Sequence, residues 1–172
     1  SIGEMLDVDL TQKFNSNYDL YLDMIYKKTA SLIEASARAA AILASKDEEK
    51  YALYGKNLGL AFQMIDDILD ITQDSSTLGK PAMLDFVEGK VTIPYLFLHQ
   101  RIEDKQKLES MYKKSLRQEE IAWIKEQMNT THALQDAILQ AKTLGNEAIE
   151  ALKDENTLDL VMIMKAMIER EF

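Results

Sequence analysis

The stretch Phe62-Gln63-Met64-Ile65-Asp66-Asp67-Ile68-Leu69-Asp70 places three carboxylates and one amide within the most apolar helical segment of the chain. On a helix with about 3.6 residues per turn, Gln63, Asp66, Asp67 and Asp70 share one face. The positions around them are mostly apolar, which is typical of a helix buried in a core. Carboxylates within such a helix are tolerated only when they are paired, hydrogen-bonded or bound to a metal. We therefore expect this stripe to line an internal polar cavity.

The composition predicts one compact unit. The chain has 172 residues, of which 47% are hydrophobic, and contains two prolines and six glycines, with no low-complexity tract. A chain of this size builds a single core, so we expect residues 1–172 to form one helical domain or part of one. The absence of cysteine excludes disulfides and thiolate metal sites, which leaves oxygen ligands as the main metal chemistry and favours the cytoplasm.

The net charge of −9 excludes some partners. Nucleic acid and an anionic membrane surface would both repel such a chain. No apolar run approaches the roughly 20 residues of a transmembrane helix, so we expect no membrane span.

Helical periodicity runs through almost the whole chain and indicates an all-α fold. We expect one helix over residues 17–44, rich in alanine, and a second that runs to about residue 75 after a capping box of Ser45 and Glu48. Residues 76–91 read as the one substantial loop. Further helices are expected over residues 92–102, with Pro94 in the first turn, and to about residues 129 and 152, with Ser115 and Thr131 as their caps. Residues 158–169 complete the set.

Three adjacent carboxylates repel one another, so a buried cluster must hold protons or bind a cation. Magnesium fits best, because it takes oxygen ligands and is usually bound by one or two carboxylates together with substrate phosphates. Phosphates would in turn need fixed cations nearby, for which Lys28, Lys80 and Lys90 are candidates. The tyrosines at helical spacings, among them Tyr18 and Tyr21, read as packing residues.

These segments together resemble the second aspartate-rich region of the trans-type polyprenyl diphosphate synthases. The resemblance rests on Phe62 through Asp70, on Gly79-Lys80-Pro81, and on Glu88-Gly89-Lys90-Val91-Thr92-Ile93-Pro94. Lys28-Thr29, one helix earlier, is similar to the Lys-Thr pair of that family. The resemblance implies an isoprenoid synthase-type helical bundle and a homodimer.

The resemblance also implies a reaction. In this family magnesium ions bridge aspartates and the diphosphate of an allylic substrate, the carbon–oxygen bond ionises, and isopentenyl diphosphate attacks the allylic cation. The metal stabilises the leaving diphosphate. The implied product is a longer polyprenyl diphosphate of the long-chain class.

Each role is carried over by position. Asp66, Asp67 and Asp70 would be metal ligands or neighbours of the metal. Lys28 and Lys80 would contact the allylic diphosphate, and Lys90 would offset charge at the metal site. Thr29 and Gln63 would orient the substrate near the cation, and Phe62 would pack against isopentenyl groups.

The chain also departs from the family pattern. It lacks the first aspartate-rich motif with its arginine pair and the upstream Gly-Lys-Arg segment. Gly3 through Leu10 resembles a segment that follows the first motif, so the chain looks like the C-terminal half of an enzyme of roughly 300 residues. One alternative is therefore a metal- and diphosphate-binding half, or a partner subunit, that is inactive without the first motif. A terpene cyclase, which shares the fold, is a weaker alternative.

Overall fold

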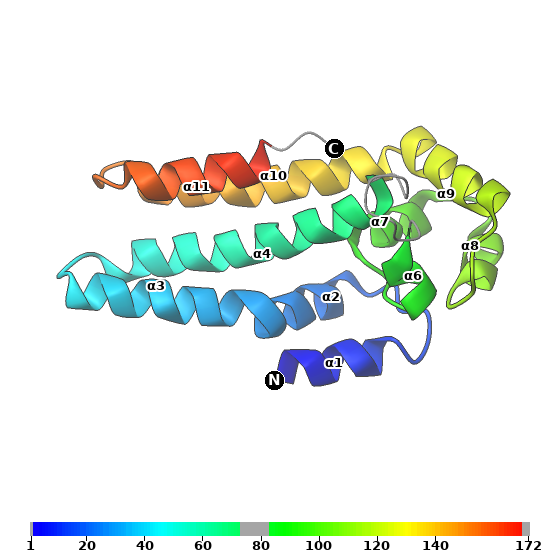
Figure 1. Ribbon diagram of the computed structural model, residues 1–172, viewed down its shortest axis with the longest axis horizontal. Coiled ribbons are helices and arrows are strands. Elements are labelled where there is room, and N and C mark those ends of the chain that lie inside the picture. Colours follow the sequence, from blue (N-terminus) through cyan, green and yellow to red (C-terminus); the bar gives the residue numbers. More distant parts are fainter. Residues whose placement is uncertain (1, 73–82, 170–172) are drawn as a thin grey trace.

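The computed structural model describes residues 2–72 and 83–169, and every regular element within them is a helix. Helix α4 (Glu48–Thr72) runs through the centre of the molecule (Figure 1). It packs against α3 (Ser31–Leu43) on one side and against α10 (Ala133–Ala151) on the other. The all-α prediction is confirmed, and the helix with the carboxylate stripe is the central one.

The remaining helices extend this framework. Helix α11 (Leu158–Ile168) returns along α10, and α1 (Ile2–Leu10) lies below α2 (Tyr18–Ile25) in Figure 1. One end of the bundle is formed by helices α6 (Leu84–Glu88), α7 (Ile93–Arg101), α8 (Lys105–Met111) and α9 (Gln118–Thr130). No helix within the described ranges combines the length and apolar character needed to cross a membrane.

The helix expected over residues 17–44 is interrupted by a π-helical turn. Residues 18–43 form α2, the π-helix η1 (Tyr26–Ala30) and α3 in direct succession. The N–H of Ser31 bonds to the carbonyl of Tyr26, five residues back. Such a turn is equivalent to one extra residue in an α-helix, and it is frequent at functional sites. Here it contains both Lys28 and Thr29.

Small residues let α4 approach this turn closely. A Cβ atom on Gly59 would lie 2.5 Å from the Cα atom of Ala30, and one on Gly55 would lie 2.8 Å from the carbonyl oxygen of Ile33. Because both contacts are with backbone, a side chain at either position would force the helices apart. The alanine-rich segment thus has a close neighbour in α4.

Three predicted helix starts are wrong in detail. Ser45 has a left-handed backbone (φ 55°), and the side chain of Asp47 caps α4 instead, accepting the N–H of Glu49 at 3.1 Å. Helix α9 begins after Arg117, whose N–H donates to Glu120 at 2.8 Å, and not at Ser115. In both of these cases a polar residue two positions further along takes the role.

Thr131 does not open α10, because it ends α9 and its hydroxyl donates to the carbonyl of Gln127 at 2.7 Å. The N-cap of α10 is His132, in a left-handed conformation. The start of α7 is confirmed, with Thr92 at the N-cap and Pro94 in the first turn. Ala137, Ala141 and Ala148 of α10 are buried in the core.

The loop predicted over residues 76–91 is partly helical. Helix α6 lies within it, and α8 was not expected either. The predicted end of the second helix near residue 75 falls among residues 73–82, outside the described residues. Two apolar cores result, one along α2, α4, α10 and α11 and one beneath α6–α9, and the polar stripe of α4 lies beside them.

Candidate functional site

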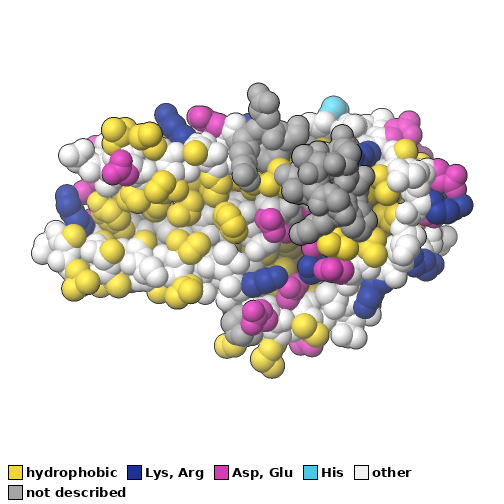
Figure 2. Space-filling view, viewed as in Figure 1, with side chains coloured by type: hydrophobic (Ala, Val, Ile, Leu, Met, Phe, Trp, Pro, Cys, Tyr) yellow, Lys and Arg dark blue, Asp and Glu magenta, His cyan; other side chains and the backbone are white. Residues whose placement is uncertain are grey.

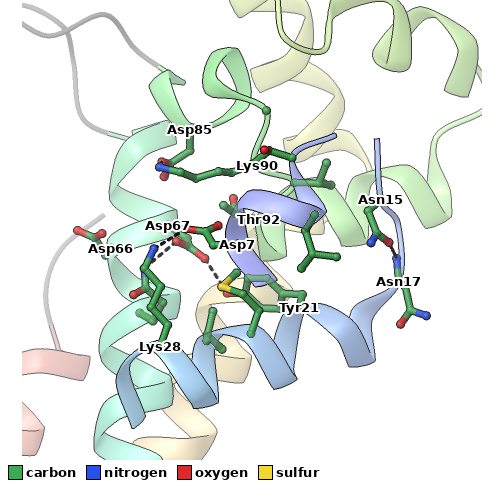
Figure 3. A pocket seen from close by; sticks show the side chains of 17 residues that line it. Asp7, Asn15, Asn17, Tyr21, Lys28, Asp66, Asp67, Asp85, Lys90 and Thr92 are labelled. Atoms are coloured by element: carbon green, nitrogen blue, oxygen red, sulfur yellow. Dashed lines mark hydrogen bonds and ion pairs between the residues drawn. The ribbon is translucent and has the colours of Figure 1, made fainter. Parts of the chain in front are cut away.

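A polar pocket of about 90 Å³ opens where α1, α2, η1 and α4 meet the segment after α6 (Figure 3). Its charged lining residues come from five parts of the chain. They are Asp7, Lys28, Asp66, Asp67, Asp85 and Lys90, with Gln63, Thr92 and Tyr21 among the uncharged ones. Of the residues predicted for the site, five therefore meet here: Lys28, Gln63, Asp66, Asp67 and Lys90.

Asp67 lies at the centre of a hydrogen-bond chain. The hydroxyl of Tyr21 donates to Oδ2 of Asp67 at 2.6 Å, and the amide of Gln63 donates to Oδ1 at 3.2 Å. The hydroxyl of Thr29 donates to the amide oxygen of Gln63 at 3.2 Å. The hydrogen bonds thus run from Thr29 to Gln63 and from Gln63 to Asp67, and Tyr21 donates to the other carboxylate oxygen of Asp67.

Burial raises the pKa of Asp67 to about 8, because water no longer solvates its charged form. The hydrogen bonds from Tyr21 and Gln63 work against this shift, and the nearby charges of Asp85 and Asp66 add to it. Burial, followed by the charge of Asp67, also raises the pKa of Tyr21 well above its usual range. Tyr21 is a core residue, as predicted, but it is also a hydrogen-bond donor within the site.

The other two aspartates of the stripe point elsewhere. Asp70 turns to α6, where its carboxylate accepts the N–H groups of Leu84 at 3.0 Å and Asp85 at 3.2 Å. Burial, and then the charge of Asp85, raises the pKa of Asp70 to about 6. Asp66 is exposed at the mouth of the pocket. Within the residues that the structure describes, no three acidic or histidine side chains form a ready metal cluster.

Both lysines of the pocket are paired with carboxylates. The amino group of Lys28 lies 2.7 Å from Asp7, and that of Lys90 lies 2.8 Å from Asp85 and 3.0 Å from Glu88. Burial disfavours the charged form of Lys90, but the hydrogen bonds to these two carboxylates outweigh it and raise its pKa.

The two neighbouring lysines of η1 have different surroundings. Lys27 pairs with Asp23 of its own helix at 2.7 Å, whereas Lys28 lines the pocket. Helix α1 lies directly against this turn, because a Cβ atom on Gly3 would come within 2.2 Å of the backbone nitrogen of Lys28. Only glycine permits so close an approach, and it brings Asp7, one turn along α1, to the amino group of Lys28.

An apolar groove of about 530 Å³ adjoins the polar pocket. Helices α3, α4 and α11 form it, and Figure 2 shows the apolar side chains gathered over this part of the molecule. Phe62, 54% exposed, lines the groove together with Leu58, Ile65, Leu69, Ile163 and Met167. Asp66 lines both the groove and the pocket, and Thr29 stands at the groove's polar end.

Three residues of the site were missed from the sequence, and one predicted residue is not described. Asp85 lies between the two Gly-Lys segments, and this position could have marked it as a candidate site residue. Asp7 lies in the stretch from Gly3 to Leu10, whose likeness to the family was also visible. No local pattern distinguishes Tyr21 from the other tyrosines. Lys80 falls among residues 73–82, outside the described residues.

The charges of the pocket suit an anionic ligand that binds together with a cation. Among the described lining residues, four carboxylates face two lysines, so the pocket carries excess negative charge when all are ionised. A divalent cation with oxygen ligands would balance that charge. The lysines could then exchange a carboxylate partner for a phosphate oxygen. The neighbouring groove offers an apolar surface to whatever the phosphate carries.

Comparisons with known proteins identify the family to which the chain is similar. A sequence model of the family described as Polyprenyl synthetase matches residues 1–131. Solanesyl diphosphate synthase 3 of Arabidopsis thaliana is 33% identical over an alignment 173 positions long, which covers 97% of this chain and 40% of that protein. A short chain isoprenyl diphosphate synthase of Methanothermobacter thermautotrophicus is also 33% identical, over 98% of this chain and 54% of that protein.

Solved structures show the same fold. The octaprenyl pyrophosphate synthase of Helicobacter pylori superposes with a TM-score of 0.90 at 42% identity, over 98% of this chain and 56% of that one. A polyprenyl synthase of Caulobacter crescentus, solved in complex with calcium and isoprenyl diphosphate, gives a TM-score of 0.84 at 30% identity and 55% of its chain. The chain thus spans about half the length of the proteins that it matches.

Proposed function

Because the chain belongs to the polyprenyl synthetase family, we propose that it forms the diphosphate-binding half of a trans-prenyltransferase. The reaction would join an allylic diphosphate to isopentenyl diphosphate and yield a longer polyprenyl diphosphate. One observation carries the proposal: the Gln63–Asp66–Asp67 face of α4 lies across a polar pocket from Lys28 and Lys90, beside an apolar groove.

The two cavities fit the two parts of an allylic diphosphate. Lys28 and Lys90 would bind phosphate oxygens in the pocket, and Lys80 remains a predicted third cation. The isoprenoid tail would lie in the groove against Phe62, where apolar walls exclude water from the reacting carbon. Thr29 stands between the two and, with Gln63, would orient the substrate near the developing positive charge.

We propose Mg²⁺ as the cofactor, because the donors available in the described part of the pocket are carboxylate oxygens with excess negative charge. Asp66, Asp67 and Asp70 remain the predicted ligands. When bound, the ion would supply positive charge that stabilises the departing diphosphate. The calcium complex of the Caulobacter crescentus relative supports a divalent cation of this kind.

The chain spans between 40% and 56% of the relatives compared above, so full activity is proposed only with the remainder of the bundle. That remainder would bring the first aspartate-rich motif and the isopentenyl diphosphate site. The predicted homodimer, a long-chain product and a cytoplasmic location belong to the same proposal. A terpene cyclase is disfavoured by the relatives compared above, which are solanesyl, isoprenyl and octaprenyl diphosphate synthases.

Calorimetry tests the proposal on the chain itself. Inorganic diphosphate should bind in the presence of Mg²⁺ and lose affinity when EDTA is added. Failure of diphosphate to bind at saturating Mg²⁺ would overturn the proposed site.

Product analysis by mass spectrometry tests the chemistry. The chain is incubated with Mg²⁺, an allylic diphosphate and isopentenyl diphosphate, with and without a separately expressed N-terminal half of a relative that carries the first motif. Isopentenyl diphosphate should enter a ladder of products only when that half is present. Products that form without consuming isopentenyl diphosphate would indicate a cyclase.

A further inference from the structure

The backbone that carries Tyr21 is fixed by an asparagine cap. The side chain of Asn17 accepts the N–H groups of Asp19 at 2.9 Å and Leu20 at 3.1 Å, and thereby begins α2. The N–H of Tyr21 then bonds to the carbonyl of Asn17 at 3.2 Å. Tyr21 thus sits in the first turn of a capped helix, where its backbone has little freedom.

The side chain of Tyr21 reaches from α2 to the middle of α4. It is 3% exposed and belongs to the core along α2, α4 and α10. Its hydroxyl lies 2.6 Å from Oδ2 of Asp67, 46 residues along the chain. An apolar ring in this place would fill the core equally well, so packing alone does not account for the hydroxyl.

The effect of that hydroxyl extends beyond Asp67. Because Tyr21 holds Oδ2, the carboxylate presents Oδ1 to the amide of Gln63, and this fixes which way the amide is turned. The amide oxygen of Gln63 is then available to the hydroxyl of Thr29. Asp67 and Gln63 line the polar pocket, and Thr29 lines the apolar groove, so the hydrogen bonds connect the two cavities.

Removing the hydroxyl would leave one oxygen of a buried carboxylate without its donor. A buried acceptor without its donor still bears the cost of leaving water, so the side chain of Asp67 would turn toward another partner. The Gln63 amide would lose its fixed acceptor, and the orientation of Thr29 would be lost with it.

We propose that Tyr21 is a positioning residue for the diphosphate site, acting through Asp67 on Gln63 and Thr29. This role rests on the proposed function, because the ligand that the three side chains receive is the diphosphate with its metal ion.

The test compares Tyr21→Phe with Tyr18→Phe. Tyr18 lies one turn earlier on α2 and stacks on Phe97, with ring centroids 5.9 Å apart, so its substitution controls for loss of a tyrosine hydroxyl from the same helix. The first readout is the pair of side-chain amide resonances of Gln63 in ¹⁵N-labelled protein without ligand. The second is the affinity for inorganic diphosphate in the presence of Mg²⁺.

In Tyr21→Phe the Gln63 resonances should move, and the diphosphate affinity should fall on the order of tenfold, as expected for loss of a hydrogen bond to a charged group. Both readouts should stay at the wild-type value in Tyr18→Phe. Unchanged Gln63 resonances, or unchanged affinity in Tyr21→Phe, would overturn the inference. If the resonances move but the wild type itself binds no diphosphate, the proposed function fails, and the role of Tyr21 in binding fails with it.

A second variant guards against a fold defect. Gln63→Leu changes a half-buried residue and removes the other donor to Asp67. It should weaken diphosphate binding as Tyr21→Phe does, and the double variant should be little weaker than either single one, because all three break the same chain of hydrogen bonds. Wild-type affinity in Gln63→Leu, or full additivity in the double variant, would contradict the role of Tyr21.

Discussion

The carboxylate of Asp70 accepts the backbone N–H of Leu84 at 3.0 Å, which ties the last turn of α4 to the first turn of α6. The same carboxylate also accepts the N–H of Asp85. Asp70 is therefore an N-terminal cap of a neighbouring helix as well as a predicted metal ligand, and the two roles can be separated by mutation.

Asp70→Ala and Asp66→Ala should differ in stability but not in binding. Both should abolish Mg²⁺-dependent binding of diphosphate. Only Asp70→Ala should lower the free energy of unfolding, by about 1 kcal/mol, since it removes the cap of α6. Urea unfolding and amide hydrogen exchange at Leu84 and Asp85 measure the difference. Retained diphosphate binding in both variants would refute the metal assignment, and equal stability would refute the cap.

Lys28→Met should weaken binding of inorganic diphosphate on the order of tenfold, because it removes a charged donor from the pocket. Lys27→Met is the matched control. Lys27 has the same chemistry and is one residue away, but it pairs with Asp23 of its own helix. Calorimetry at constant Mg²⁺ gives both affinities. An equal loss in the two variants would show that the lysines act only through general charge.

The fold should become less stable as pH rises when no divalent metal is present. Asp67 has a folded pKa of about 8, far above its unfolded value of about 4. A carboxyl group with a raised folded pKa binds its proton more tightly in the folded state, so its ionisation opposes folding. The destabilisation is absent below the unfolded pKa, grows between the two values and is complete above the folded one. Asp70, with a pKa raised to about 6, adds to the lower part of this range.

Urea unfolding in EDTA at a series of pH values between about 4 and 8.5 measures this effect, since those values span both pKa values of Asp67. Asp67→Asn does not titrate, so its stability should decline less over the range than that of the wild type. Parallel curves for the two proteins would show that folding does not raise the pKa of Asp67.

The helix stripe was a good guide to which residues matter, but not to how they are used. Periodicity places Gln63 and the three aspartates on one side of α4, and of these Gln63, Asp66 and Asp67 line the pocket. Periodicity does not show which neighbours these side chains meet, and the neighbours decide the hydrogen bonds. The hydroxyl of Tyr21 donates to Asp67, and a backbone N–H of α6 donates to Asp70.

Helix starts show the same limit on a local scale. Around residue 45 both Ser45 and Asp47 can cap a helix, and their order along the chain does not decide between them. The structure uses Asp47 because Ser45 adopts a left-handed backbone at the end of α3. Lys27 and Lys28 were likewise equivalent in sequence, and the π turn and α1 separate them.

Gly59→Ala should destabilise the protein even though alanine favours helix. The added Cβ atom would meet backbone atoms of Ala30 at 2.5 Å, which cannot move without shifting η1. We expect a loss of about 1–3 kcal/mol, as for an overpacked core. Gly145→Ala is the comparison, because its Cβ atom would meet the Ile168 side chain, which can turn aside, and the loss there should be smaller. A stabilised Gly59→Ala protein would contradict the close approach of α4 to η1.

Because of the π turn at Tyr26–Ala30, the number of residues in this segment matters as much as their types. Each residue rotates a helix by about 100°, so an ordinary α-turn with one residue fewer would swing α2 around its axis relative to α3. Tyr21 would then face away from Asp67 although every residue of the site was still encoded. The orientation of the site therefore depends on the number of residues in this turn. Substitutions do not change that number, whereas deletion of a single residue does.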